Sequence, residues 1–237
     1  MTSTTLTERF DHAFQYAHDL HRDQLRKGPD GIPYVSHLLG VTGIVLEMGG
    51  SENAAIAALL HDTVEDVEPA ERRDAVRTYI RDTFGDGVAE AVAAATEDVD
   101  LAEGEEADED GKPHFAVRKQ SKLAKLHRLE GDGLLVTIAD KLHNARTILM
   151  IDPSQRWERF RKTVDGELEP VSYTAQKQRW WYSGLSRALA SHRSALDGQP
   201  LAQEHLDEFV RVVEQLFEPD GLLPEGAPYP ERNEVAS

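Results

Sequence analysis

Apolar residues recur at intervals of three and four along most of this chain, the spacing that places them on one face of an α-helix. The first such segment predicts a helix over residues 7–26, and the same periodicity predicts helices near 36–48, 54–60, 69–84, 87–96, 114–129, 133–149, 172–192 and 201–217. Runs of alternating β-branched residues bounded by hairpin turns are nearly absent. The pattern therefore predicts an all-α fold, a helical bundle with about ten helices.

Residues that stop or start helices divide the chain at several points. Gly49 and Gly50 end the second predicted helix, Ser51 is a good N-cap for the third, and Gly85 follows the helix near 69–84. We expect a single domain over residues 1–218, with a motif-bearing core at about 8–150 and C-terminal helices at about 172–217. Residues 152–170 are expected to be irregular, and residues 219–237 to form a flexible tail.

The charge balance excludes several classes of function. Of the 237 residues, 43 are acidic and 26 are Lys or Arg, which gives a formal net charge of −17. We expect no binding to DNA or RNA, whose phosphates require an excess of basic side chains. The chain has no cysteine, which excludes disulfides, thiolate nucleophiles and iron–sulfur clusters. Neither a signal-peptide pattern nor an apolar run of ~18 residues is present, so we expect a cytoplasmic protein without a membrane partner.

An acidic tract occupies residues 97–112, with the sequence EDVDLAEGEEADEDGK. Its composition predicts a solvated loop, because it contains few apolar side chains that a core would bury. Its acids do not follow the ordered spacing of an EF-hand loop, so a calcium site is the weaker interpretation.

The segment that carries chemistry directly follows the apolar helix at 54–60. His61, Asp62, Glu65 and Asp66 are four ionisable residues within six positions. On a helix, His61 and Glu65 stand four apart, as do Asp62 and Asp66, so the two pairs line adjacent faces. Acids at a helix C-terminus oppose the helix dipole, and they are costly to bury alone. A divalent cation at His61 and Asp62 removes both objections, whereas an exposed helix end with solvated acids is the simpler alternative.

Two other segments supply further metal ligands. Residues 26–37 place the basic pair Arg26-Lys27 and a tight turn before His37, at the start of a helix. Residues 138–147 place Asp140 in an otherwise apolar helical run, with Asn144 one turn further along the same face. Two imidazoles and two carboxylates form a ligand set suited to a divalent metal, here His37, His61, Asp62 and Asp140.

In this order, the three segments resemble the motifs of the HD-superfamily metal-dependent phosphohydrolases. They are most similar to the hydrolase domain of RelA/SpoT-type stringent-response enzymes and to the stand-alone small alarmone hydrolases. The resemblance covers roughly residues 8–150. The matching stretches are 17–24 with Arg26-Lys27, Pro33-Tyr34 before His37, 57–66 with the string HDTVED, Phe84-Gly85, and 139–147.

The resemblance implies a reaction and a role for each matching residue. It implies one divalent ion, manganese in the family, at His37, His61, Asp62 and Asp140. Glu65 and Asp66 match the pair that positions and deprotonates the attacking water. Arg26, Lys27, Asn144 and Thr147 match residues that bind the anionic nucleotide substrate. The implied reaction removes the 3′-pyrophosphate of guanosine 3′,5′-bis(diphosphate), or of the pentaphosphate, to give GDP or GTP and pyrophosphate.

Two other functions stay open at this point. A phosphatase with the same metal site that acts on an adenine alarmone or on NADPH fits the motifs, and so does a non-catalytic module that binds a nucleotide or a partner protein. The complete metal-ligand set argues against the non-catalytic module. A homo-oligomer is also open, since the apolar faces of the last two helices offer an interface.

Several other residues have a structural interpretation. His143 is expected to cap the helix or to contact the metal site from outside, not to bind metal. Trp180, Trp181 and Tyr182 are expected in the core, because aromatic residues at helical spacing are more often core than a base-stacking platform. The histidines of the first helix lack a carboxylate that would complete a metal site: His12, His18 and His21.

Overall fold

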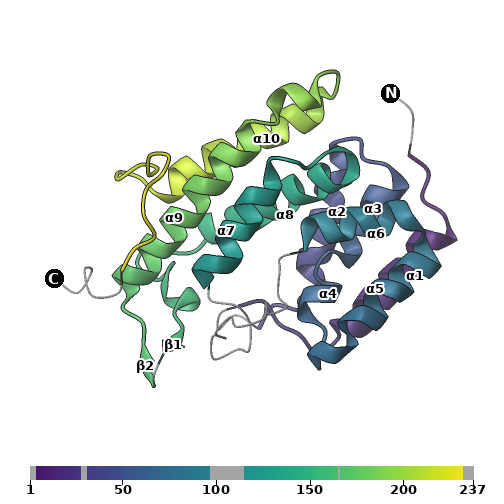
Figure 1. Ribbon diagram of the computed structural model, residues 1–237, viewed down its shortest axis with the longest axis horizontal. Helices are drawn as coiled ribbons and strands as arrows, with labels where there is room; N and C mark the ends of the chain where they lie inside the picture. Colours follow the sequence, from purple (N-terminus) through teal and green to yellow (C-terminus); the bar gives the residue numbers. More distant parts are fainter. Residues whose placement is uncertain (1–3, 28–30, 97–114, 165, 232–237) are drawn as a thin grey trace.

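The computed structural model describes residues 4–27, 31–96, 115–164 and 166–231 (Figure 1). The expected all-α class is confirmed. The α-helices are α1 Glu8–Leu20, α2 Val35–Glu47, α3 Glu52–Leu60, α4 Thr63–Asp66, α5 Arg73–Phe84, α6 Asp86–Ala95, α7 Phe115–Leu126, α8 Gly131–Leu149, α9 Val171–Ala190 and α10 Pro200–Leu216. Short 3₁₀ turns lie at η1 Ala70–Arg72, η2 Glu158–Phe160 and η3 Arg193–Leu196. The strands β1 Thr163–Val164 and β2 Glu167–Leu168 form a small antiparallel hairpin.

Helix α3 lies at the centre of the N-terminal half, where it contacts α1, α2, α6 and α8. Ser51 is its N-cap, as the sequence predicts, and the Ser51 hydroxyl accepts a hydrogen bond from the backbone N–H of Ala54 at 3.1 Å. Every residue from 54 to 60 is buried. The alanines in this run let four helices approach closely, so α3 delivers His61 at its C-terminal end to the middle of the protein.

Helix α8 runs between the two halves of the molecule. Figure 1 shows α1 and α5 on one side of the central helices, and α9 and α10 on the other. α8 contacts α2, α3 and α6 on its N-terminal-half side, and α10 on its other side. Gly133 permits the contact with α6, because a Cβ there would lie 2.7 Å from the Cβ of Ala94. The close fit of α8 against α2 and α3 brings its one buried acid, Asp140, toward the end of α3.

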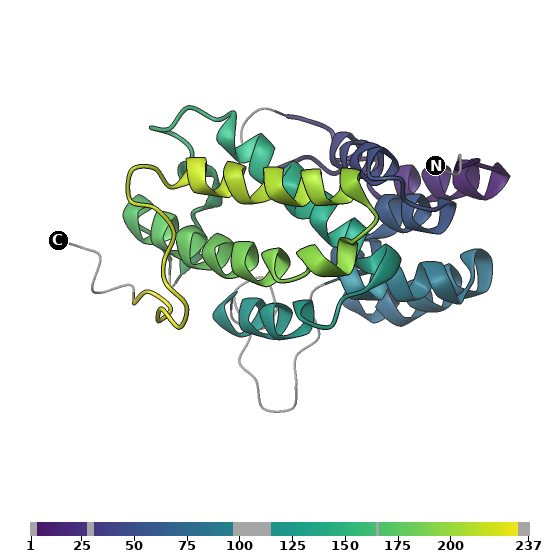
Figure 2. The same ribbon diagram turned by 90° about the horizontal axis from the view of Figure 1, so that it is seen from above.

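The C-terminal helices complete the core. α9 and α10 run side by side in Figure 2, and α10 buries the predicted face of Leu206, Phe209, Val213 and Leu216. Trp180, Trp181 and Tyr182 are buried in the same apolar cluster, which confirms their predicted place in the core. These faces are therefore used inside the chain. In the part of the chain that the structure describes, no helix is both long and apolar enough to span a membrane.

The predicted helix over residues 7–26 is wrong in extent. It ends at Leu20, because the chain turns there and Leu25 forms a bridge with Pro33, with the Arg26 N–H donating to the Ile32 carbonyl at 2.8 Å. The HDTVED string is not one continuous helix. α3 ends at Leu60 and a separate turn of helix, α4, begins at Thr63. The break falls at His61 and Asp62, so His61 and Glu65 do not lie on one continuous helix.

The segment after α10 lies along α9. The Arg179 guanidinium donates to the Gly221 carbonyl at 2.7 Å, and the Trp180 indole N–H donates to the Ala227 carbonyl at 3.1 Å. The backbone N–H of Leu223 donates to the Ser183 hydroxyl at 2.9 Å. These contacts argue against a freely flexible tail over 219–231. Residues 232–237 lie outside the described residues, as does the predicted loop at 97–112.

Candidate metal centre

Four predicted ligands from three helices converge on one point. His37 lies on α2, His61 and Asp62 follow α3, and Asp140 lies on α8. The Nε2 atoms of the two histidines are 3.2 Å apart. Asp62 Oδ2 is 3.0 Å from His61 Nε2 and 3.5 Å from His37 Nε2, and Asp140 Oδ1 is 3.7 and 3.3 Å from the same atoms. The structure therefore brings together the whole set that the sequence singled out.

Burial and charge make this site suited to a cation. His37 and His61 are each 1% exposed and Asp140 is 5% exposed. Burial by itself would lower the pKa of His61, yet Asp62 and Asp140 raise that pKa well above its usual value. Burial would raise the pKa of Asp62, but the two histidines hold it well below its usual range. A buried imidazole, that of His61, which neighbouring carboxylates drive to accept a proton marks a site of negative potential, and the nitrogen and oxygen donors of the site suit a divalent first-row metal.

The outer nitrogen of each histidine is also engaged. His61 Nδ1 donates to the Ala58 carbonyl at 2.8 Å, which leaves the Nε2 lone pair facing the site. His37 Nδ1 lies 2.9 Å from Nδ1 of His143 on α8. Burial, with His37 and Arg26 nearby, lowers the pKa of His143 to about 4. His143 is therefore neutral near pH 7 and contacts the site from outside, in agreement with its expected role.

The two carboxylates are held by neighbours that the sequence analysis gave no role. The Tyr34 hydroxyl donates to Asp62 Oδ2 at 2.5 Å. Asp140 Oδ2 pairs with the Lys141 ammonium at 2.7 Å. Burial works against the Asp140 charge, but Lys141 and then the two histidines hold its pKa well below its usual range. Both neighbours lie within three positions of a predicted ligand, which is the one signal that would have indicated them.

The two predicted catalytic acids lie on α4, one turn beyond Asp62. Glu65 and Asp66 are half-buried. Gln24 fixes Asp66 from the turn after α1, because its amide donates to Asp66 Oδ2 at 2.8 Å. The other end of the same amide, Gln24 Oε1, lies 2.5 Å from Nδ1 of the buried His21. Both acids thus lie on the turn of helix that directly follows the predicted ligand Asp62.

The predicted substrate-binding residues divide into two groups. Arg26 and Asn144 meet beside the site. The Arg26 guanidinium donates to Asn144 Oδ1 at 2.8 Å, and Asn144 Nδ2 donates to Asp140 Oδ1 at 2.6 Å. Thr147 instead donates its hydroxyl to the Asn144 carbonyl at 2.9 Å, within its own helix. Lys27 is exposed and lies directly before residues 28–30, which the structure does not describe.

A profile of the HD domain matches residues 13–165 of this chain, a range that contains every predicted site residue. The chain belongs to the HD domain family. It is 35% identical over 201 residues to a guanosine-3′,5′-bis(diphosphate) 3′-pyrophosphohydrolase MESH1 from Danio rerio, covering 83% of this chain and 92% of that protein. The corresponding Xenopus tropicalis protein is 30% identical over 202 residues, covering 84% and 94%.

Longer HD family members contain this region as one part. The chain is 32% identical to a GTP pyrophosphokinase from Streptomyces coelicolor, but it spans only 17% of that protein's length. Among solved structures, that of a metazoan SpoT ortholog that hydrolyses ppGpp superimposes with a TM-score of 0.60 at 23% identity, covering 88% of this chain and 97% of the other. This likeness shows the shared fold.

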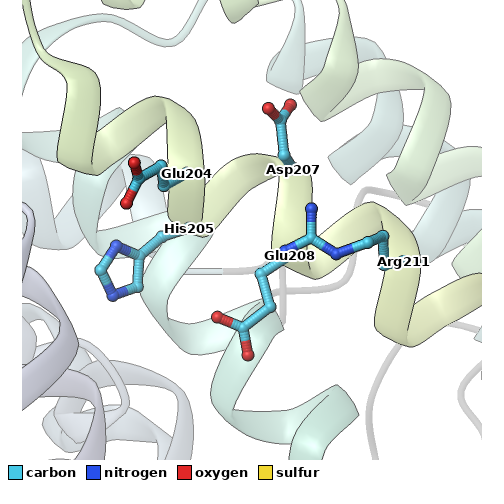
Figure 3. A pocket seen from close by; sticks show the side chains of 5 residues that line it. All are labelled: Glu204, His205, Asp207, Glu208 and Arg211. Carbon is cyan, nitrogen blue, oxygen red and sulfur yellow. The ribbon is translucent and has the colours of Figure 1, made fainter.

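A shallow hollow of about 240 Å³ lies on the surface at α10, and its lining includes none of the predicted metal ligands. Figure 3 shows its lining, five side chains that all come from α10: Glu204, His205, Asp207, Glu208 and Arg211. Several of these residues contact neighbouring helices. Glu208 pairs with Arg146 of α8, and His205 Nε2 lies 3.2 Å from a carboxylate oxygen of Glu47 on α2. The hollow is thus a charged seam between helices, and we assign it no ligand.

Proposed function

We propose that this protein is a metal-dependent phosphohydrolase that removes the 3′-pyrophosphate of guanosine 3′,5′-bis(diphosphate) or its pentaphosphate analogue. The observation that carries the proposal is the convergence of four side chains: the Nε2 atoms of His37 and His61 are 3.2 Å apart, and Asp62 Oδ2 and Asp140 Oδ1 each lie 3.0–3.7 Å from both of these nitrogens. The MESH1 relatives, which span most of this chain, support the substrate.

His37, His61, Asp62 and Asp140 would hold the ion, for which we propose manganese. When bound, a divalent ion would polarise phosphoryl oxygens and would lower the pKa of bound water by many units. The protein's own residues then decide orientation and proton transfer. We propose that the whole described chain acts as one domain in the cytoplasm, on a nucleotide and not on DNA or RNA.

Glu65 is the proposed base. It lies three positions after Asp62, on the turn of helix α4 that directly follows this ligand, and a carboxylate can take a proton from water. Asp66, held by Gln24, orients the water from the neighbouring position. The water oxygen forms a bond to the phosphorus attached to the ribose 3′-oxygen. The bond between that phosphorus and the 3′-oxygen breaks, the 3′-oxygen gains a proton, and pyrophosphate leaves.

Arg26 and Lys27 are proposed to bind phosphate. A basic pair next to the site supplies the local positive field that a highly anionic substrate needs in a chain of net charge −17. Because Arg26 also donates to Asn144, and Asn144 to Asp140, substrate contact at Arg26 is connected to a metal ligand through two hydrogen bonds. Thr147 is proposed to contribute at the sugar–phosphate end.

A substrate panel tests the proposal. Purified protein with Mn²⁺, and the same protein with a chelator, are given guanosine tetraphosphate, an adenine alarmone and NADPH, and the phosphorus products are identified. We expect Mn²⁺-dependent pyrophosphate release from the guanosine substrate. If the protein cleaves another nucleotide but not guanosine tetraphosphate, the proposed substrate is rejected and the proposed metal site stands. Binding without turnover of any nucleotide would favour the non-catalytic module.

Variants of α4 separate the roles of its acids. Glu65→Gln is expected to lower kcat by about 10²- to 10⁴-fold with little change in Mn²⁺ affinity, because it removes the base and leaves the ligands. Asp62→Asn should lower both kcat and Mn²⁺ affinity, because it removes a charged metal ligand. Glu68→Gln is the matched control, since Glu68 is exposed just beyond α4. Equal loss of Mn²⁺ affinity in Glu65→Gln and Asp62→Asn would contradict the assignment of Glu65 as base.

A further inference from the structure

We propose that His143 is a positioning residue of the metal centre, and that Gly40 is a glycine because the His143 ring must pack directly against α2. This inference rests on the proposed metal site and adds a residue pair to it. His143 orients His37 and does not bind the ion.

The hydrogen-bond logic of the two imidazoles gives His143 its role. For His37 to present the Nε2 lone pair to a metal, its Nδ1 must carry the proton and donate it to an acceptor. The atom 2.9 Å from His37 Nδ1 is Nδ1 of His143. His143 Nδ1 therefore accepts, and its own proton sits on Nε2. His61 achieves the same state with a backbone carbonyl, that of Ala58 at 2.8 Å.

The position of the other His143 nitrogen shows that this residue is not a ligand. A Cβ built on Gly40 would lie 2.3 Å from both Cδ2 and Nε2 of His143. The Nε2 edge of the ring thus faces the backbone of α2, and Nδ1 faces His37. Both nitrogens of His143 are directed at α2 and neither is left for the ion.

Gly40 is the feature of α2 that admits the ring. Its position is three residues after His37, so both lie on the face of α2 that meets α8. Any larger residue would push the His143 ring away from His37. Gly43 offers a built-in comparison, because it lies on the same helix and a Cβ there would meet nothing within 4 Å.

Substitutions of His143 and Gly40 test the inference through Mn²⁺ affinity, measured by the electron paramagnetic resonance signal of free Mn²⁺. His143→Phe keeps a ring and removes the acceptor, and we expect a dissociation constant about 10- to 100-fold higher. His143→Asn places an amide oxygen close to the position of the lost Nδ1, and we expect recovery to within about threefold of wild type. His192→Phe is the control for loss of a buried histidine, since His192 bonds the Leu126 carbonyl far from the site.

Gly40→Ala is expected to raise the dissociation constant about tenfold, and Gly43→Ala to leave it unchanged. In the His143→Phe background, Gly40→Ala should cause no further loss of Mn²⁺ affinity, because the bond that it disturbs is already gone. Thermal unfolding in chelator checks that each variant is folded, and His143→Leu replaces His143→Phe if the larger ring prevents folding.

The outcomes distinguish this inference from the proposed function. If wild-type protein binds no Mn²⁺, both fall. If wild type binds Mn²⁺ and His143→Phe binds it equally well, or if His143→Asn is as impaired as His143→Phe, the positioning role of His143 is overturned and the metal site stands. Equal effects of Gly40→Ala and Gly43→Ala would overturn the role of Gly40.

Discussion

The Tyr34 hydroxyl donates a hydrogen bond of 2.5 Å to Asp62 Oδ2, the same oxygen that faces both metal-site histidines. The Tyr34 ring is held in place by neighbours on several sides. It stacks on His21 with 4.9 Å between ring centroids, meets His37 edge-on at 5.6 Å, and lies 5.7 Å from the Arg26 guanidinium carbon. Burial, and then the negative charge of Asp62, raise the pKa of Tyr34, so the phenol keeps its proton and remains a donor.

Tyr34→Phe should therefore weaken Mn²⁺ binding by about tenfold, because the ring packing stays while Asp62 loses the group that orients it. Isothermal titration of the apoprotein with Mn²⁺ measures the change. Tyr79→Phe is the matched control, since it also deletes a hydroxyl paired with a histidine, His12 at 3.0 Å, but away from the site. Unchanged Mn²⁺ affinity in Tyr34→Phe would show that the hydroxyl does not support Asp62.

Lys122 lies on α7, and its buried ammonium caps the C-terminal end of α6. It is 2% exposed, and its ammonium donates to the carbonyls of Ala94, Ala95 and Thr96 at 2.6, 2.7 and 3.3 Å. Lys122→Met leaves these acceptors without that donor, and we expect the free energy of unfolding to fall by about 2–3 kcal/mol.

Urea titration of Lys122→Met and Lys125→Met provides the comparison, because Lys125 lies on the same helix and is exposed. The Lys125 variant should stay within about 0.5 kcal/mol of wild type. Similar losses in the two variants would mean that the contacts of Lys122 with the end of α6 contribute no specific stability.

Arg146 and Glu208 join α8 to α10 through two parallel hydrogen bonds of 2.7 Å. The Arg146 bonds lower the pKa of Glu208 below its usual value, while partial burial opposes this. A carboxyl whose pKa is lowered by folding stabilises the protein above its unfolded-state pKa, and this contribution is lost as the pH falls through the folded-state value. The pair should thus contribute at pH 7 and cease to do so in acid.

We expect Glu208→Gln to lower the free energy of unfolding by about 0.5–1 kcal/mol at pH 7, a modest value because both side chains are partly exposed. Denaturant titrations of wild type and variant from about pH 7 down to about pH 3.5 should show the difference shrinking below about pH 4.3. A difference of the same size across this range would contradict the pairing. Glu204→Gln, an exposed change on the same helix, controls for the loss of one charge.

Much of this arrangement could be predicted from local sequence. The Ser51 cap, the buried run at 54–60 and the single acid in the apolar helix around Asp140 are each encoded within a few residues, so helical periodicity was sufficient to find them. The ligand set could be named because a carboxylate in an apolar run requires a partner.

The contacts that depend on helix crossings could not be predicted. The pairing of His37 with His143 depends on α2 and α8 meeting at Gly40. Local sequence patterns do not show where two helices cross when they are about a hundred residues apart in the chain. The break between α3 and α4 could have been expected from local sequence, because His61, Asp62 and Thr63 are weak helix formers.

Hydrolysis of guanosine tetraphosphate in water enriched in ¹⁸O, followed by mass spectrometry of the products, tests the central claim most directly. If water attacks phosphorus at the metal centre, the wild-type protein with Mn²⁺ should release pyrophosphate that carries one ¹⁸O atom, together with unlabelled GDP, and a chelator should abolish both. Label in the GDP, orthophosphate as the sole phosphorus product, or no Mn²⁺-dependent product at all would contradict the account.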